Sequence, residues 1–126
     1  MVDYGFIVGQ LLEGLEVTLE LTFLGFMGGF ILGVVLAIAR TYGGKISKLL
    51  STAYVELIRG TPMLLQLYII GFGLPLFIRE HYRGFVMNPT LAVTLGIILN
   101  SAAYQAEYIR GAVSYTHLTL PTICSV

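Results

Sequence analysis

Charged side chains are scarce in this chain of 126 residues: 11% of its residues are Asp, Glu, Lys or Arg, whereas 56% are hydrophobic. Soluble domains carry about 25% charged residues, so this chain has too few of them to cover a water-soluble surface. The formal net charge is zero, which gives no indication of a nucleic-acid partner. The composition therefore predicts a membrane protein.

Cysteine and histidine are almost absent, since the chain has Cys124, His81 and His117 as its only examples. These counts exclude an internal disulfide and leave no Cys/His metal constellation or Ser-His-Asp set. The sequence also lacks the G-x-x-x-x-G-K-[ST] loop that cradles phosphates, and its first ten residues lack the basic segment of a cleaved signal peptide. We expect no metal, no cofactor and no catalytic residues.

Three apolar stretches can be picked out, at about residues 17–39, 62–78 and 85–106. A spanning helix needs roughly 20 apolar residues, a length that the first and third stretches reach and the second approaches. Helices are expected because lipid cannot satisfy free backbone groups and because strict alternation is missing. The sequence predicts an all-α integral membrane protein with three transmembrane helices.

Basic residues predict the orientation of these spans. The connection between the first and second spans is the richest in them, whereas the segment before the first span has acidic residues and no Lys or Arg. The four basic residues of this connection are Arg40, Lys45, Lys48 and Arg59. The positive-inside rule then places the connection in the cytoplasm and the N-terminus outside.

The first span carries small residues at every fourth position, namely Gly25, Gly29, Gly33 and Ala37. This spacing makes one smooth stripe along a helix, against which another helix can pack closely. We favour packing within the chain over a dimer interface, because such stripes are common in membrane helices.

The segment before the second span combines a turn with polar residues. Thr61 is expected to cap a helix whose first residue is Pro62, with Gly60 allowing the turn into it. Arg59 follows Glu56 by three residues, the spacing of neighbours on a helix face. A plain structural role at the membrane entry is our preferred interpretation.

Pro75 lies within the second span, after Gly71 and Gly73. Because proline cannot donate a backbone hydrogen bond, it is expected to kink or end that helix. The kink could border a pathway that changes shape, or it could be a helix end near the outer surface. The sequence leaves both interpretations open.

The third span carries the most suggestive polar set. Asn100, Tyr104 and Glu107 follow an i, i+4, i+7 spacing and so share one face, with Ser101 adjacent. Polar groups in a membrane helix face the bundle interior or a cavity, because exposing them to lipid is costly. These four residues are candidates for lining a pathway. Equally weighted alternatives are hydrogen bonding between helices and, for Glu107 and Arg110, a simple exit into the cytoplasm.

The final segment, Val113–Val126, reads VSYTHLTLPTICSV and resembles a translated sequencing adapter. Val113–Thr122 matches the adapter residue by residue, and Ile123–Ser125 has the length of a sample index. The resemblance implies a non-native tail that replaces the protein's own sequence after about Ala112. We expect this tail to be extended or poorly packed.

Three blocks of the sequence resemble the N-terminal part of permease subunits from bacterial polar amino-acid ABC importers, the histidine/glutamine/arginine group. The blocks are residues 12–40, Tyr54–Pro75 and Asn100–Gly111, and the most recognisable stretch is ELIRGTPMLLQ at Glu56–Gln66. The signature positions, to which we assign a structural role, are Glu56, Arg59, Gly60, Thr61, Pro62 and Gln66.

This resemblance implies a type I ABC importer permease in the bacterial inner membrane, with residues 1–112 forming the N-terminal part of its transmembrane domain. Such a subunit would pair with a second permease, identical or different, to form a pathway for a polar amino acid. Separate ATPase subunits would hydrolyse ATP, an extracytoplasmic binding protein would deliver substrate, and alternating access would move it. The family's cytoplasmic coupling loop has no counterpart in this sequence, so this polypeptide is not expected to transport by itself.

The sequence leaves two other functions open. One is a small, self-contained channel or transporter that oligomerises through the stripe at Gly25, Gly29 and Gly33. The other is a membrane scaffold subunit without transport activity. Neighbouring genes for an ATPase and a secreted binding protein would favour the importer alone.

Overall fold

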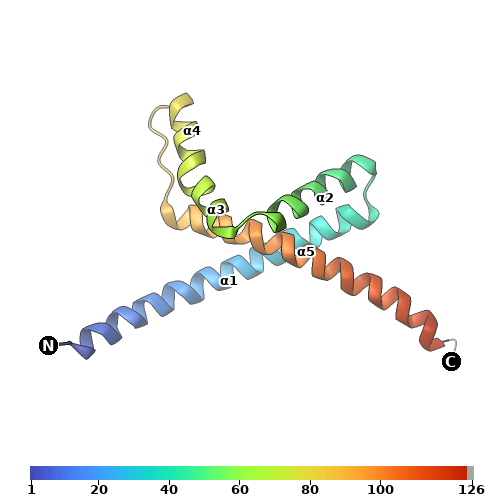
Figure 1. Ribbon diagram of the computed structural model, residues 1–126, viewed down its shortest axis with the longest axis horizontal. Helices are drawn as coiled ribbons and strands as arrows, with labels where there is room; N and C mark the ends of the chain where they lie inside the picture. The colour runs from blue at the N-terminus through green and yellow to red at the C-terminus, as the bar shows by residue number, and fades with distance from the viewer. Residues whose placement is uncertain (125–126) are drawn as a thin grey trace.

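The computed structural model describes residues 1–124, with side chains for residues 1–115, and every regular element in that part of the chain is helical. The elements are α1 (Tyr4–Tyr42), α2 (Lys45–Gly60), α3 (Met63–Tyr68), the π-helical turn η1 (Ile69–Gly73), α4 (Leu74–His81) and α5 (Pro89–Cys124). Two long helices, α1 and α5, cross near their middles, and the shorter elements lie on one side of the crossing (Figure 1).

Helix α1 begins earlier than the span predicted at residues 17–39. Its first turn is capped by Asp3, whose carboxylate accepts hydrogen bonds from the backbone N–H groups of Gly5 and Phe6 at 3.1 and 3.3 Å. The helix has 39 residues, a length of about 58 Å, whereas the hydrocarbon core of a bilayer is about 30 Å thick. The span predicted from hydropathy, residues 17–39, is therefore the apolar part of a longer helix.

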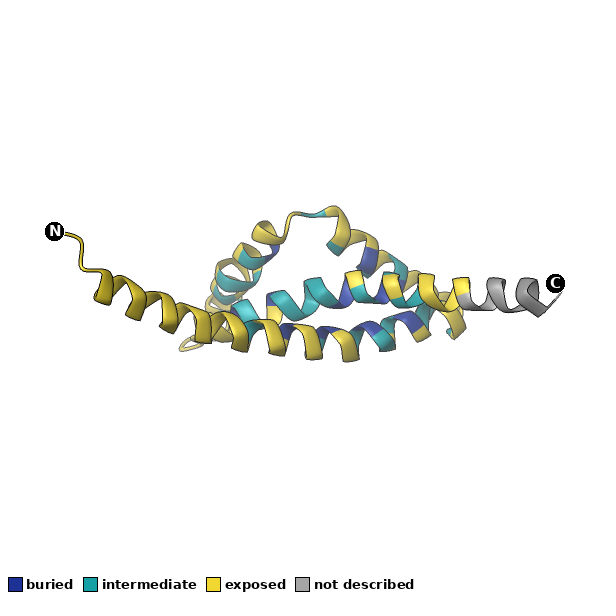
Figure 2. Cartoon of the chain, turned by 90° about the horizontal axis from the view of Figure 1, so that it is seen from below, coloured by how far each residue is buried: buried dark blue, intermediate teal, exposed yellow. Residues whose placement is uncertain are grey.

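Small residues hold α1 and α5 together. Gly25, Gly29, Gly33 and Ala37 are the four buried residues of α1, and α5 presents Ala102, Ala103 and Ala106 with at most 1% exposure. Burial is confined to the region where the helices cross, while α1 before Leu21 is exposed throughout (Figure 2). The stripe thus serves contacts within the chain.

The connection between α1 and the second predicted span is itself a helix, α2, rather than a loop. Ser51 and Val55 form its buried face, and the hydroxyl of Tyr54 donates a hydrogen bond to the Leu99 carbonyl of α5 at 2.7 Å. Apolar residues at helical spacing along this stretch could have indicated it. Helix α2 brings Glu56 and Arg59 alongside α5.

The predicted capping role of Thr61 is wrong. Thr61 ends α2 as its C-cap, and Pro62, expected as the first helical residue, is instead the N-cap of α3. The Thr61 hydroxyl donates a hydrogen bond to the Leu57 carbonyl at 2.9 Å. Because the last four carbonyls of a helix have no partner within it, the Thr61 hydroxyl satisfies the end of α2.

Pro75 follows an interruption in α-helical hydrogen bonding. The backbone N–H of Leu74 donates to the Ile69 carbonyl, five residues earlier, which closes the π turn η1. Pro75 then occupies the first turn of α4, where its missing N–H costs least. The helix therefore changes its hydrogen-bond pattern before the proline and continues to His81.

Two stretches of the described chain are long and apolar enough to cross a membrane, Tyr4–Tyr42 and Met63–His81. The third predicted span lies within α5, where Asn100, Ser101 and Gln105 lower the hydropathy, so three spans remain a prediction. Helix α5 continues to Cys124, so residues 113–124 of the tail are helical, whereas an extended or poorly packed tail was expected. Residues 111–115 are exposed, and the packing of residues 116–126 lies outside the described side chains.

Candidate functional site: polar contacts between the helices

The four polar residues predicted to line a pathway all lie on α5, and the structure gives them different surroundings. Asn100 contacts α3, Ser101 faces α1, and the ring of Tyr104 lies 5.8 Å from the guanidinium carbon of Arg59. Glu107 forms ion pairs with arginines of three helices. Asn100 and Glu107 make hydrogen bonds to other helices. The hydroxyl of Ser101 is instead hydrogen-bonded within α5, and Tyr104 makes a cation–π contact. A role of these four residues in a pathway stays a prediction.

Gln66 of α3 is at the centre of a buried hydrogen-bonded group. It is 7% exposed, and its amide nitrogen lies 2.7 Å from the Ile58 carbonyl, 2.7 Å from the Thr61 hydroxyl and 3.1 Å from the Thr61 carbonyl. Its amide oxygen accepts a hydrogen bond from the Asn100 side chain at 3.2 Å. One side chain thus joins the end of α2, the start of α3 and the middle of α5.

The sequence marked Gln66 only as an interruption of an apolar run and as a signature position. Its partners include two backbone carbonyls, which no spacing pattern identifies. The available signal was the cost of burying an amide in a membrane helix, which requires hydrogen-bond partners for it. Asn100, predicted as polar and inward, is one of those partners.

Ser101 belongs to the contact between α1 and α5. Its hydroxyl accepts a hydrogen bond from Gln105 at 2.7 Å, and Gln105 also donates to the Phe26 carbonyl of α1 at 3.3 Å. A Cβ atom on Gly29 would lie 2.6 Å from the Cβ atom of Ser101. The close approach of the two helices therefore requires glycine at position 29.

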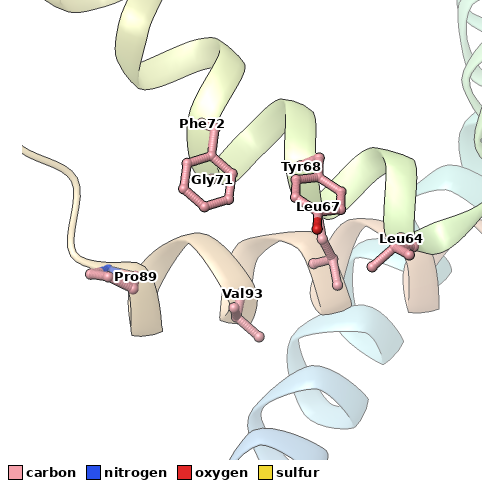
Figure 3. Close-up of a pocket in the computed structure, with 7 residues that line it drawn as sticks. All are labelled: Leu64, Leu67, Tyr68, Gly71, Phe72, Pro89 and Val93. Atoms are coloured by element: carbon pink, nitrogen blue, oxygen red, sulfur yellow. The ribbon is translucent and has the colours of Figure 1, made fainter.

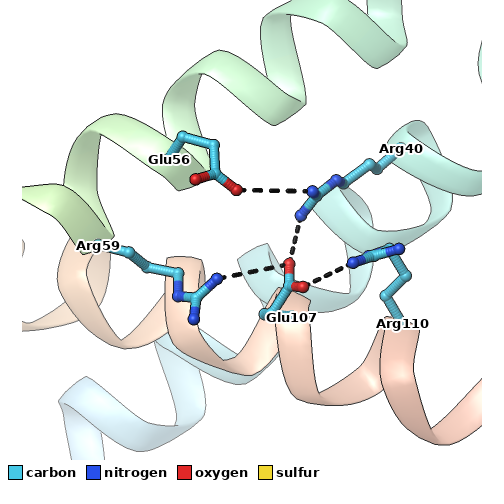
Figure 4. A network of polar contacts seen from close by, with 5 residues as sticks. All are labelled: Arg40, Glu56, Arg59, Glu107 and Arg110. Atoms are coloured by element: carbon cyan, nitrogen blue, oxygen red, sulfur yellow. Dashed lines mark hydrogen bonds and ion pairs between the residues drawn. The ribbon is translucent and has the colours of Figure 1, made fainter.

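Glu107 is shared by three arginines (Figure 4). Its carboxylate pairs with Arg40 of α1, lies 3.9 Å from Arg59 of α2, and accepts a hydrogen bond from Arg110 at 2.6 Å. Glu56 pairs with Arg40 at 3.8 Å, so Glu56 and Arg59, which are three residues apart on α2, take different partners. The cluster ties the ends of α1 and α2 to α5.

Glu107 lies just beyond the predicted third span, which ends at Ala106. The hydrogen bond from Arg110, opposed by burial and reinforced by the charge of Arg40, holds the pKa of Glu107 below its usual range. A lowered carboxyl pKa means that the folded protein favours the charged form. The arginines therefore extend the pH range in which Glu107 is ionised to more acidic values.

Replacing Glu107 with Gln should destabilise the fold at neutral pH by about 1–3 kcal/mol, because the arginines lose their shared counter-charge. Since the folded pKa is lowered, the stabilisation is complete above roughly pH 4.3, the usual Glu value, and is lost as pH falls through the lowered pKa. Unfolding in detergent across this pH range measures the difference between variant and parent. Glu80→Gln, an exposed change of equal charge on α4, is the control.

Apolar pockets flank these polar contacts. One, of about 270 Å³, lies between α3, η1 and the start of α5, lined by Leu64, Leu67, Tyr68, Gly71, Phe72, Pro89 and Val93 (Figure 3). Another, of about 300 Å³, has Thr61 and Gln66 as its polar residues. Neither has a charged residue in its lining, and the part of the chain with described side chains has no group of three His, Cys, Asp or Glu that could hold a metal.

The chain is similar in sequence to permease proteins of amino-acid transport systems. It is 38% identical to the glutamine transport system permease protein GlnP of Escherichia coli over 107 residues, which are 85% of this chain and 47% of that protein. It is 36% identical to the arginine transport system permease protein ArtQ of Bacillus subtilis over 104 residues, 82% and 45% of the two chains.

The fold is similar to that of a solved structure, the crystal structure of an amino acid ABC transporter with histidines. The TM-score is 0.77 with 35% identity, over 90% of this chain and 52% of the other. No protein-family model matches the chain. The chain thus spans about half the length of the curated relatives that it matches. Similarity in both sequence and structure shows that the chain belongs to the family of amino-acid ABC transporter permeases.

Proposed function

We propose that this chain is part of a permease subunit that forms the translocation pathway of an ATP-driven amino-acid importer in the bacterial inner membrane, with its N-terminus outside. The observation that carries the proposal is the match to amino-acid permeases over 82–90% of the chain, in sequence and in fold. It favours an importer over the small channel and the scaffold. The proposed substrate class is polar amino acids.

The geometry supports a pathway that moves by rigid bodies. Small residues join α1 and α5 over a close crossing, whereas α3 contacts α5 through Leu67, which lies against Gly96, and through the hydrogen bond between Gln66 and Asn100. Alternating access requires helix groups that keep their internal packing while moving relative to one another. Asn100, Ser101, Tyr104 and Glu107 remain the proposed pathway residues, with Tyr104 the most exposed of them.

The proposed partners are a second permease subunit, cytoplasmic ATPase subunits and an extracytoplasmic solute-binding protein. Val113–Val126 is proposed to be a tail derived from a sequencing adapter, so residues 1–112 would be the native part of the domain. The permease proteins that this chain matches are about twice as long as the matched region. This length is consistent with further native sequence that the tail replaces.

The test begins by resequencing the source locus across codon 112. We expect the reading frame to continue into a cytoplasmic Glu-Ala-Ala-type loop and further hydrophobic spans. The complete permease, with ATPase and binding protein from neighbouring genes, should then take up labelled glutamine, arginine or histidine into proteoliposomes only when ATP and the binding protein are present.

Two results would contradict the proposal. Genomic DNA that encodes Val113–Val126 followed by a stop codon would show that the tail is native. Uptake that needs neither ATP nor a binding protein would favour a self-contained channel. An ATPase variant without its phosphate-loop lysine is the matched control, because it should assemble normally and abolish uptake.

A further inference from the structure

The arginine cluster around Glu107 is one negative charge short. It contains the guanidinium groups of Arg40, Arg59 and Arg110 but only two carboxylates, those of Glu56 and Glu107. Of the two, Glu56 is the more exposed, with 62% of its side chain accessible, against 23% for Glu107. The cluster therefore carries an excess positive charge that these residues do not neutralise.

The arginines also have more donors than these contacts use. Arg59 is 37% exposed and reaches Glu107 only at 3.9 Å, while Arg110 is 40% exposed and uses one terminal nitrogen on Glu107. The Nε atom of Arg110 is buried and has no acceptor among the described residues, so the donors that Arg110 offers to a ligand are on its terminal nitrogens. Because each guanidinium has five N–H donors in a planar fork suited to phosphate, an oxyanion could bind the exposed faces of Arg59 and Arg110.

Helix α2 indicates which kind of phosphate would bind. Lys45, Lys48 and Arg59 are separated by three and eleven residues and so lie on one face of the helix. Next to that face is an exposed apolar stripe of Ile46, Leu49, Leu50 and Leu57, each at least 65% exposed. A basic face beside an apolar stripe is typical of a helix at a membrane surface, where headgroups meet acyl chains.

We propose that the exposed guanidinium groups of Arg59 and Arg110 bind the phosphodiester headgroup of an anionic phospholipid, while Lys45 and Lys48, about 16 Å or more from Arg59 along α2, face the headgroups of neighbouring lipids. A phosphodiester carries the single negative charge that the cluster lacks, and the apolar stripe of α2 would contact the acyl chains. Basic pockets between membrane helices are known to bind such headgroups. The proposal does not depend on transport, so it can fail while the permease function stands.

The test measures binding of phosphatidylglycerol and phosphatidylcholine to the purified chain in detergent by native mass spectrometry. Arg59→Gln should weaken phosphatidylglycerol binding about fivefold, and phosphatidylcholine binding should not change. Arg83→Gln is the matched control, because it removes the same charge from the exposed connection between α4 and α5 and should change binding less than about twofold.

A second variant changes the charge in the opposite direction. Glu56→Gln removes an exposed carboxylate from the cluster and should tighten phosphatidylglycerol binding about two- to fivefold, a gain that a misfolded protein would not show. Glu80→Gln is its control. Equal losses in Arg59→Gln and Arg83→Gln, or no gain in Glu56→Gln, would overturn the proposal. Full displacement of the lipid by millimolar inorganic phosphate would also overturn it, because the site would then take free phosphate.

Discussion

Replacing Gly29 with Leu should separate α1 from α5 and destabilise the chain by about 3 kcal/mol or more, at the upper end of overpacking costs. A Cβ atom at this position would lie 2.6 Å from the Cβ atom of Ser101 and 3.1 Å from the side-chain nitrogen of Gln105. Leucine adds further atoms to that clash, so the helices must move apart. Thermal unfolding of the purified chain in detergent measures the loss.

Gly14→Leu is the matched control, because it makes the same change on the same helix where a Cβ atom has nothing within 4 Å. It should leave the unfolding temperature nearly unchanged. Equal stability of the two variants would contradict the assignment of the stripe to packing within this chain. An equal loss in both would show that the added leucine side chain itself, and not its clash with α5, causes the destabilisation.

Replacing Gln66 with Leu should produce the second large effect, a destabilisation of about 2–4 kcal/mol. Leucine has a similar size, but it leaves the Asn100 amide and the Thr61 carbonyl without the partner that they have now. Each buried polar group without a hydrogen bond costs about 1–3 kcal/mol. Gln10→Leu, an exposed change on α1, is the control for the substitution itself.

A double-mutant cycle separates the hydrogen bond from other effects of the leucine. Asn100→Leu should also destabilise the fold, but the double variant should lose less than the sum of the single losses, because one of the unpaired groups is removed with its partner. Additive losses would show that Gln66 and Asn100 contribute independently and that the 3.2 Å contact adds no stability of its own.

Part of this architecture follows from local patterns in the sequence. The small residues at every fourth position marked the face of α1 that packs, because the 3.6-residue helical period fixes which side chains share a face. The apolar stretches likewise indicated an all-α membrane protein. The polar residues of α5 were identified as inward because hydrocarbon does not solvate them.

Other features depend on contacts between distant residues, which no local pattern specifies. Threonine is a residue type that often begins a helix. The Thr61 hydroxyl instead donates hydrogen bonds to carbonyls in the last turn of α2, because the chain turns there between two helices. Glu107 was expected to face a pathway or the cytoplasm, and three arginines from α1, α2 and α5 converge on it. The crossing of these helices brings the three arginines and Glu107 together.

The π turn at Ile69–Gly73 offsets the helical period of α4 from that of α3. A turn with five-residue hydrogen bonding holds one residue more than an α turn, so residues beyond it are rotated by about 100° relative to an uninterrupted α-helix. Side chains of α3 and α4 therefore follow two helical periods offset by one residue. Deleting one residue within Ile69–Gly73 would bring the two periods into phase and leave the residues of α4 on the faces that they occupy now.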